Sequence, residues 1–94
     1  MRPCRIYIYR FAEKQLRRIP AHVRSAFYVW ASDIESRGLI AVRRSPGYHD
    51  EPLKGSRSGQ RSIRLSRSYR VIYEEDEQNN LTIVGIREIN KHDY

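Results

Sequence analysis

Two short segments of alternating apolar and polar residues constrain the fold of this chain more than any other feature. They occupy residues 61–66 and 69–73, and such alternation is typical of β-strands with one buried side. If the two segments pair, their apolar residues lie on one side of the sheet only when the residue numbers of each facing pair add up to an even number. A three-residue loop that sets Leu65 opposite Tyr69 meets this condition. The sequence therefore predicts an antiparallel hairpin with one apolar side.

This pairing places Arg64 opposite Arg70 on the polar side of the hairpin. Like charges that face each other across a strand pair are destabilising. A sequence that puts them there either leaves both in solvent or places an anion between them, and guanidinium groups suit a phosphate well. A solvated basic surface and a phosphate-binding site are the two interpretations that remain open.

The first half of the chain predicts one strand followed by two helices. Residues 5–9 alternate isoleucine with tyrosine, as expected of a strand. Residues 11–19 place apolar side chains at roughly helical spacing, with charged ones between them, which predicts a short amphipathic helix. A second helix begins at Pro20 and ends at Gly38, because apolar residues recur at steps of three and four between them. We expect that apolar stripe to be core: Val23, Ala26, Phe27, Trp30, Ala31 and Ile34.

The second half of the chain predicts the remaining strands. Residues 39–42 are a short apolar run before a turn-rich loop, and residues 74–80 predict an acidic and polar turn. Residues 81–89 are apolar on both sides, as expected of an interior strand. The whole order predicts an α+β fold, with two helices on one face of a small, mostly antiparallel four-stranded sheet. Residues 1–94 form a single domain, and the polar face of the hairpin is the expected working surface.

Composition narrows the classes of partner. The chain has 18 Lys and Arg against 11 Asp and Glu, a net charge of +7, which suits polyanions such as RNA and an acidic protein equally well. A lone Cys4 excludes an internal disulfide and a cysteine zinc site, and favours a reducing cytoplasm. No apolar run is long enough to predict a membrane span or a signal peptide.

A set of short motifs lies between residue 51 and the end of the chain: Glu51, Pro52, Leu53, Lys54, Gly59, Arg64, Arg70, Tyr73 and a terminal pair, His92 and Tyr94. Taken together, these motifs resemble those of the RelE/ParE superfamily of bacterial toxins. The likeness extends over nearly the whole chain and is greatest to the YoeB and HigB-like ribosome-dependent endoribonucleases. Each motif is weak singly, and together they are specific.

The resemblance implies a RelE-like fold and a metal-independent, cofactor-free cleavage of mRNA in the A site of the 30S ribosomal subunit. In that reaction the ribose 2′-hydroxyl attacks the adjacent phosphodiester, so a base, an acid and positive charge around the phosphorane are needed. Carried over by motif position, Glu51 corresponds to the general base and His92 to the general acid. Arg64 and Arg70 correspond to the clamp on the phosphate and the transition state.

Further positions receive supporting roles. By the same resemblance, Lys54 holds the RNA backbone or the developing charge, and Tyr94 orients or stacks the nucleotide at the cleavage point. Arg61 and His49 are further candidates for contacts to the substrate. His49 also rivals Glu51 as the base, because an unperturbed glutamate has a pKa of about 4.3 whereas imidazole titrates nearer neutrality.

The end of the chain departs from the YoeB pattern, in which His and Tyr are adjacent. Here Asp93 separates His92 from Tyr94. We interpret Asp93 as a further substrate-site candidate that either orients His92 or is solvated. The assignment of acid and base among Glu51, His49 and His92 therefore stays open.

Two other functions fit the same sequence. One is a ParE-like inhibitor of DNA gyrase on the same fold, which needs no acid and base pair. The other is a non-catalytic basic module that binds RNA or an acidic protein. A nucleotide-binding glycine loop, metal-ligand spacing and a nucleophilic serine or cysteine context are all missing from the sequence. The resemblance also implies a cognate antitoxin protein as partner.

Overall fold

The structure of the protein is a computed structural model that describes residues 3–91. Three α-helices and a five-stranded sheet make up this part of the chain. In chain order the elements are β1 (Cys4–Ile8), α1 (Arg10–Arg18), α2 (Ala21–Arg37), α3 (Leu39–Arg43), the 3-10 turn η1 (Pro46–Tyr48), β2 (Glu51–Pro52), the 3-10 turn η2 (Gly55–Arg57), β3 (Gln60–Arg64), β4 (Tyr69–Gln78) and β5 (Leu81–Lys91).

The long helix α2 forms where the apolar stripe predicts it. Pro20 precedes its first turn, and Gly38 ends it with a positive φ of 91°, a conformation that costs glycine little. The stripe packs into the core except for Ala26, whose side chain is half-buried: Val23, Phe27, Trp30, Ala31 and Ile34 are buried. The apolar run that follows forms the extra helix α3, because Leu39 and Val42 complete one more buried turn.

The sheet has the strand order β1-β5-β4-β3-β2. β1 pairs with β5 in parallel, and the other three pairings are antiparallel. β5 therefore lies between two neighbours, which confirms that it is an interior strand. Beyond the end of β1, helix α1 lies along the edge of β5 that β1 leaves unpaired. There Gln15 Oε1 accepts a hydrogen bond of 2.7 Å from the Ile89 N–H.

The β3–β4 hairpin has the predicted register. Arg64 pairs with Arg70 and Ile63 with Val71, so paired positions sum to an even number throughout. The loop closes with a 2.9 Å hydrogen bond from the Leu65 N–H to the Tyr69 carbonyl oxygen. The apolar side of the hairpin faces the core, as expected of its alternation.

Two expectations about strands are wrong. The acidic run at residues 74–80 is strand for most of its length, because β4 extends to Gln78 and the turn is only Asn79 and Asn80. Both asparagines have positive φ, 47° and 68°, as in the tight turns that join twisted antiparallel strands. The sheet also has five strands instead of four, because Glu51 and Pro52 pair with β3 as β2.

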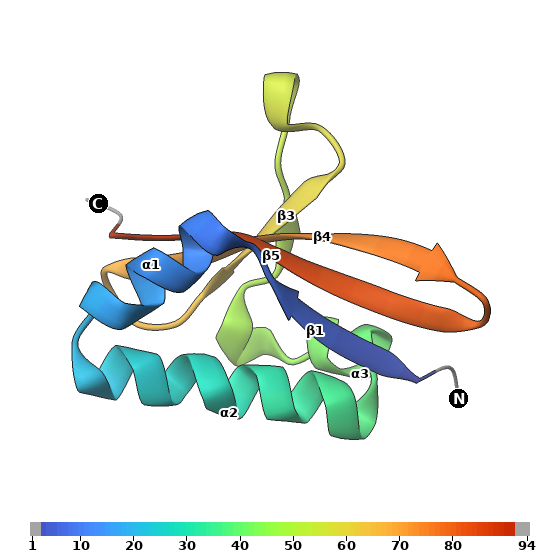
Figure 1. Ribbon diagram of the computed structural model, residues 1–94, viewed down its shortest axis with the longest axis horizontal. Helices are drawn as coiled ribbons and strands as arrows, with labels where there is room; N and C mark the ends of the chain where they lie inside the picture. The colour runs from blue at the N-terminus through green and yellow to red at the C-terminus, as the bar shows by residue number, and fades with distance from the viewer. Residues whose placement is uncertain (1–2, 92–94) are drawn as a thin grey trace.

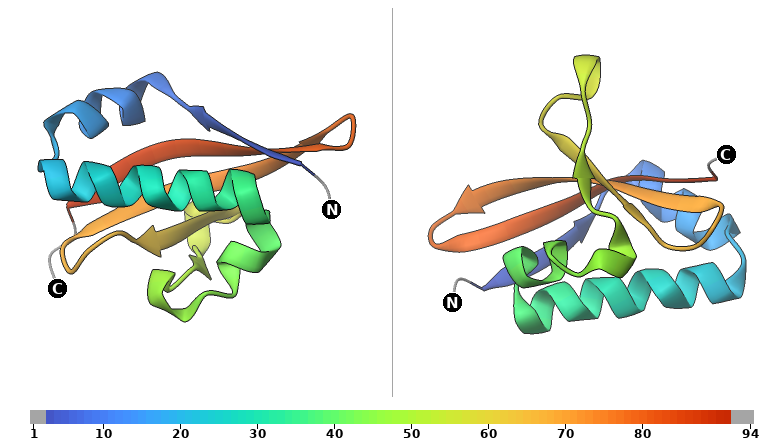
Figure 2. Two further views of the ribbon diagram at one scale, coloured as in Figure 1. Left: turned by 90° about the horizontal axis from the view of Figure 1, so that it is seen from below. Right: turned by 180° about the vertical axis from the view of Figure 1, so that it is seen from behind.

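The two faces of the sheet are covered differently. One face packs against the helices around a single core, which includes Trp30, Phe27, Tyr73, Val84 and Ile86. The other face carries the connection from β2 to β3, residues 53–59, which we call the arm. Figures 1 and 2 show α2 lying along one face while the arm rises from the other. Each helix within residues 3–91 is too short or too polar to cross a membrane.

Candidate functional site

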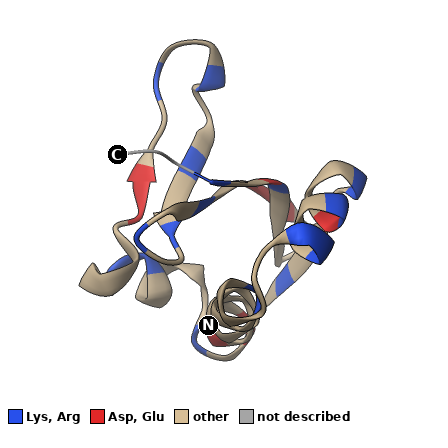
Figure 3. Cartoon of the chain, turned by 90° about the vertical axis from the view of Figure 1, so that its left-hand side faces the viewer, with Lys and Arg blue, Asp and Glu red and all other residues tan. Residues whose placement is uncertain are grey.

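Glu51 lies on the face of the sheet that the helices leave open. It is the first residue of β2 and pairs with Ser62 of β3. Successive residues of a strand point to opposite faces. Because the neighbouring Asp50 points toward the core, Glu51 points away from it. The Glu51 side chain is 66% exposed, which leaves its carboxylate accessible to a ligand. Figure 3 shows the acidic β2 beside strands that carry basic residues.

Arg64 and Arg70 lie on this same open face, directly opposite each other on β3 and β4. Arg70 is held between two neighbours: its Nη2 donates to Ser62 Oγ at 2.5 Å and lies 3.9 Å from Glu51 Oε1. Because Ser62 is fully buried, its hydroxyl is a fixed acceptor. The structure thus brings together the carboxylate and both guanidinium groups on one surface, which we call the arginine face: Glu51, Ser62, Arg64 and Arg70.

The arm adds further positive charge beside the arginine face. Arg57 reaches from η2 to the sheet, where Nε donates to Gln60 Oε1 at 3.0 Å and Nη2 forms an ion pair with Glu88 of β5. Lys54 lies at the start of the arm with its side chain exposed. Gly59 ends the arm with a φ of 96°, which favours glycine. The arm therefore presents two cations, one held and one open to solvent.

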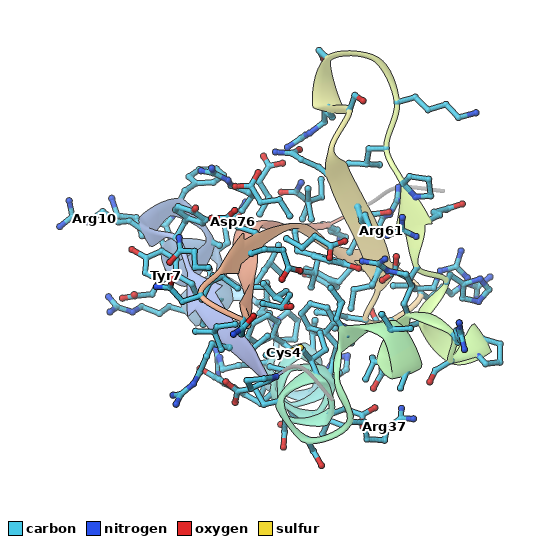
Figure 4. The ribbon with its side chains drawn as sticks, turned by 90° about the vertical axis from the view of Figure 1, so that its right-hand side faces the viewer. Cys4, Tyr7, Arg10, Arg37, Arg61 and Asp76 are labelled. Atoms are coloured by element: carbon cyan, nitrogen blue, oxygen red, sulfur yellow. The ribbon has the colours of Figure 1, made fainter. Side chains whose placement is uncertain are left out.

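Arg61 lies on the opposite face of the sheet from the arginine face, and His49 lies in the turn before β2. Arg61 pairs with Pro52 of β2 and Tyr73 of β4. It precedes Ser62, the partner of Glu51, by one residue, so its side chain lies on the opposite face of the sheet from that of Glu51. Figure 4 shows Arg61 beside the segment that leads into β2. His49 is exposed at the end of η1 with a φ of 49°, outside the strand pairing. A direct substrate contact by Arg61 is therefore not supported by its position.

Beneath β2 lies a buried polar cluster that the sequence analysis did not identify. Asp50 Oδ1 accepts a hydrogen bond of 2.6 Å from Arg61 Nε, and Oδ2 accepts one of 2.5 Å from the Tyr73 hydroxyl. Burial, together with the bond to Asp50, raises the pKa of Tyr73, so its phenol stays protonated and keeps donating. Arg43 Nε lies 4.0 Å from Asp50 Oδ1 and adds a second positive charge.

Sequence reasoning also missed Ser62, Arg57 and Glu88. Ser62 is a small hydroxyl residue on the polar side of β3, and Glu88 is the one acidic residue of β5. Both are signals of a polar contact made on folding, because buried polar groups need partners. Their partners are distant in sequence, so the pattern alone does not name them.

Three predicted site residues, His92, Asp93 and Tyr94, lie outside the described residues. Their roles as acid, orienting group and stacking group stay predictions. β5 runs to Lys91, which pairs with Tyr69 at the end of the β3–β4 hairpin. Among residues 3–91, His, Cys, Asp and Glu side chains form no group of three that could hold a metal ion.

The arginine face combines groups that suit a phosphodiester. Two opposed guanidiniums can share the oxygens of one phosphate, and the buried Ser62 keeps one of them oriented before a ligand binds. An exposed carboxylate within 3.9 Å of Arg70 can accept a proton from a hydroxyl of the same ligand. The arrangement fits a phosphate ester of a nucleic acid chain that carries a neighbouring hydroxyl.

Comparison with other proteins finds likeness in structure and none in sequence. No family model matches the chain, and no curated protein sequence matches it. A YoeB/ParE toxin from Agrobacterium tumefaciens superposes with a TM-score of 0.70 at 16% identity, over 95% of this chain and 99% of that one.

Two toxin–antitoxin complexes give similar superpositions. The RelBE2 complex from Mycobacterium tuberculosis has a TM-score of 0.68 at 20% identity, covering 96% of this chain and 99% of that one. The archaeal RelE–RelB complex from Pyrococcus horikoshii OT3 has a TM-score of 0.67 at 21% identity, covering 97% and 96%. At these identities the likeness establishes a shared fold.

Proposed function

We propose that this chain, which has the fold of the RelE and YoeB toxins, is the toxin of a type II toxin–antitoxin system and cleaves mRNA in the ribosomal A site. The observation that carries the proposal is the arginine face. Arg70 lies opposite Arg64, is hydrogen-bonded to buried Ser62 and is 3.9 Å from the Glu51 carboxylate. Two opposed arginines beside an accessible carboxylate suit the oxygens of a phosphodiester and the hydroxyl next to it, which supports the proposal.

The proposed reaction needs only groups of the chain and the RNA. Glu51 takes the proton of a ribose 2′-hydroxyl, whose oxygen attacks the adjacent phosphorus. Arg64 and Arg70 stabilise the negative charge that develops on the phosphorane oxygens. The bond from phosphorus to the 5′-oxygen then breaks, and His92 protonates the leaving oxygen. The products are a 2′,3′-cyclic phosphate and a 5′-hydroxyl end.

Lys54 and the tail complete the proposed site. Lys54 is exposed at the base of the arm, and in the proposed complex its ammonium binds the RNA backbone. Tyr94 stacks on the nucleotide at the cleavage point, and Asp93 orients His92. His49 serves at most as an alternative base, since it lies outside the pairing that holds Glu51.

A protein antitoxin is the proposed partner of the toxin. Two structures with this fold are complexes of a toxin with its antitoxin, RelB in the archaeal case. The net charge of +7 favours a partner that carries acidic residues, and the cytoplasm is the proposed location because ribosomes are there.

The proposal is tested by adding the purified protein to translating ribosomes and mapping the 5′ ends of the mRNA. We expect cuts within codons in the A site, and no cuts with Arg70→Ala, which removes one guanidinium of the clamp. Arg18→Ala, on the exposed side of α1, is the matched control and should cut like the wild type. Intact mRNA in the presence of wild-type protein contradicts the proposal.

A gyrase inhibitor is the second candidate, favoured by the likeness to a toxin described as YoeB/ParE. Such an inhibitor acts by binding and needs neither Arg70 nor His92 as a chemical group. If the double variant Arg70→Ala and His92→Ala stays toxic in cells while DNA breaks accumulate, gyrase is the target. Loss of toxicity in that variant favours the ribonuclease.

A further inference from the structure

The proposed reaction makes no use of Asp50, the most deeply buried carboxylate near the arginine face. Its side chain is only 2% exposed. Burying a charged carboxylate costs several kcal/mol unless it is paired and hydrogen-bonded. Here both oxygens are occupied, Oδ1 by Arg61 Nε at 2.6 Å and Oδ2 by the Tyr73 hydroxyl at 2.5 Å. These two donors offset the cost of burial, and they link the segment that enters β2 to Arg61 and Tyr73.

Asp50 attaches β2 to the sheet, because β2 is too short to form many hydrogen bonds of its own. The strand contains two residues, and Pro52 has no N–H to donate to the ladder. The two donors to Asp50 come from the neighbouring strands, because Arg61 of β3 and Tyr73 of β4 are directly paired. The carboxylate therefore joins β2 to two strands at once, at the point where the chain enters the sheet.

This connection decides where Glu51 points. Adjacent residues of a strand project to opposite faces, so fixing Asp50 on the core side directs Glu51 to the open face. There its carboxylate lies 3.9 Å from Arg70, which is itself fixed by Ser62. A loosened β2 would leave Glu51 exposed and charged but without a defined distance to the phosphate, and small displacements of a reacting group are costly.

We infer that Asp50 is a positioning residue for the proposed ribonuclease: its buried carboxylate ties β2 to β3 and β4 and thereby holds Glu51 beside Arg70. The catalytic part of this inference rests on the proposed function. The anchoring part does not, because it concerns the packing of β2 alone. The two parts are tested by separate measurements.

The catalytic part is tested by single-turnover cleavage of mRNA on ribosomes. We expect Asp50→Asn to slow cleavage by about tenfold while the affinity for the programmed ribosome changes by less than about twofold. Asp33→Asn, which removes a carboxylate paired with Arg37 on α2, is the matched control and should cut at the wild-type rate. An equal rate for Asp50→Asn and wild type overturns the inference.

A double variant separates positioning from a general loss of structure. If Asp50 acts through Glu51, Asp50→Asn has little further effect in a Glu51→Gln background, less than about twofold. If Asp50 only stabilises the fold, the two losses multiply, and that result overturns the inference.

Amide hydrogen exchange tests the anchor whether or not the protein cuts RNA. The Leu53 N–H donates to the Gln60 carbonyl oxygen at 2.9 Å, just beyond β2, and reports on the attachment of that strand. We expect the Leu53 amide to exchange at least about tenfold faster in Asp50→Asn, with the Phe27 amide of α2 unchanged. Unchanged exchange at Leu53 contradicts the anchor even if cleavage is lost.

Tyr73→Phe provides the same test if Asp50→Asn does not fold. It removes one donor to Asp50 and keeps the aromatic ring, which is fully buried against Trp30. We expect a smaller change in the same direction, about threefold in cleavage and in exchange at Leu53. Wild-type values of both in Tyr73→Phe overturn the inference.

Discussion

The guanidinium of Arg70 is oriented before any ligand arrives, because its Nη2 donates to the buried hydroxyl of Ser62. Its side chain is 23% exposed, so part of the cost of ordering it is met on folding. The planar fork of arginine then presents its remaining donors to one side, which an ammonium on a flexible stem does not do. We therefore expect the geometry of Arg70 to matter more for the proposed function than its charge.

Arg70→Lys tests this distinction. The substitution keeps the charge but loses the fork, so we expect cleavage of mRNA on ribosomes to fall by about 100-fold. Arg18→Lys on the exposed side of α1 is the matched control and should cut at the wild-type rate. A rate for Arg70→Lys close to wild type would show that charge alone is sufficient.

Tyr73 makes the stability of the protein depend on alkaline pH. Burial and the hydrogen bond to Asp50 raise its pKa above the usual value of 10.0, so the unfolded chain loses this proton at a lower pH than the folded chain. A raised pKa stabilises the fold below pH 10 and loses that contribution as pH rises further. We expect the free energy of unfolding to fall by about 1.4 kcal/mol per pH unit above pH 10 from this group.

Tyr73→Phe removes that contribution. In urea denaturation between about pH 8 and pH 11, the variant should be less stable than wild type at the lower end, and the difference should narrow above about pH 10. A constant difference across the range would mean that the Tyr73 hydroxyl titrates normally in the folded protein.

At the scale of elements, the β4–β5 hairpin depends on two residues. Asn79 and Asn80 both have positive φ, which asparagine tolerates better than most residues and glycine tolerates best. The turn sets the register of the two strands from Gln78 opposite Leu81 to Tyr73 opposite Ile86, and a bulge between Ile72 and Tyr73 shifts it beyond that point. β4 continues through the acidic residues at 74–77, and two of these pair with arginines: Glu74 with Arg87 Nη2 at 2.6 Å and Glu75 with Arg43 Nη2 at 2.7 Å.

Asn80→Gly and Asn80→Ala form a matched pair that tests the turn. Alanine at a φ of 68° should cost about 1 kcal/mol in the free energy of unfolding, whereas glycine should be neutral or stabilising. Urea denaturation with an unchanged m value measures both. Equal midpoints for the two variants would show that the turn does not limit stability.

At the scale of the whole molecule, the net charge of +7 and the placement of the arginine face act together. In the proposed function, charge over the whole surface attracts RNA from any direction, but only groups that contact phosphates release counterions on binding. The helices leave one face of the sheet open, and that face carries the opposed arginines and the arm. If the proposed function holds, the overall charge raises the rate of encounter with RNA, and the open face is the surface on which we expect the RNA to bind.

Salt dependence of RNA binding tests this division. We expect Arg64→Ala to reduce the slope of log affinity against log salt by about 0.7, the value for one contact to a single-stranded phosphate. Arg18→Ala changes the net charge equally but lies on α1, so its slope should equal that of the wild type. Equal slopes in all three proteins would mean that Arg64 does not contact the RNA.

Local periodicity by itself determined much of this protein. The apolar stripe of α2, its ends at Pro20 and Gly38, and the even parity of the β3–β4 hairpin all follow from contacts between residues close in sequence. The opposition of Arg64 and Arg70 is part of that parity, so the centre of the candidate site was predictable. The α+β class with a mostly antiparallel sheet follows from the order of these elements.

Only the tertiary structure decided the rest, because it depends on partners far apart in the chain. Residues 51–52 become a strand only when β3 offers them an edge, and that pairing sends Asp50 and Glu51 to opposite faces. Arg61 and Tyr73 are the hydrogen-bond partners of Asp50, and no sequence periodicity links these three positions. Local sequence determines which residues of a strand share one face, whereas the folded sheet determines which distant residues those side chains contact.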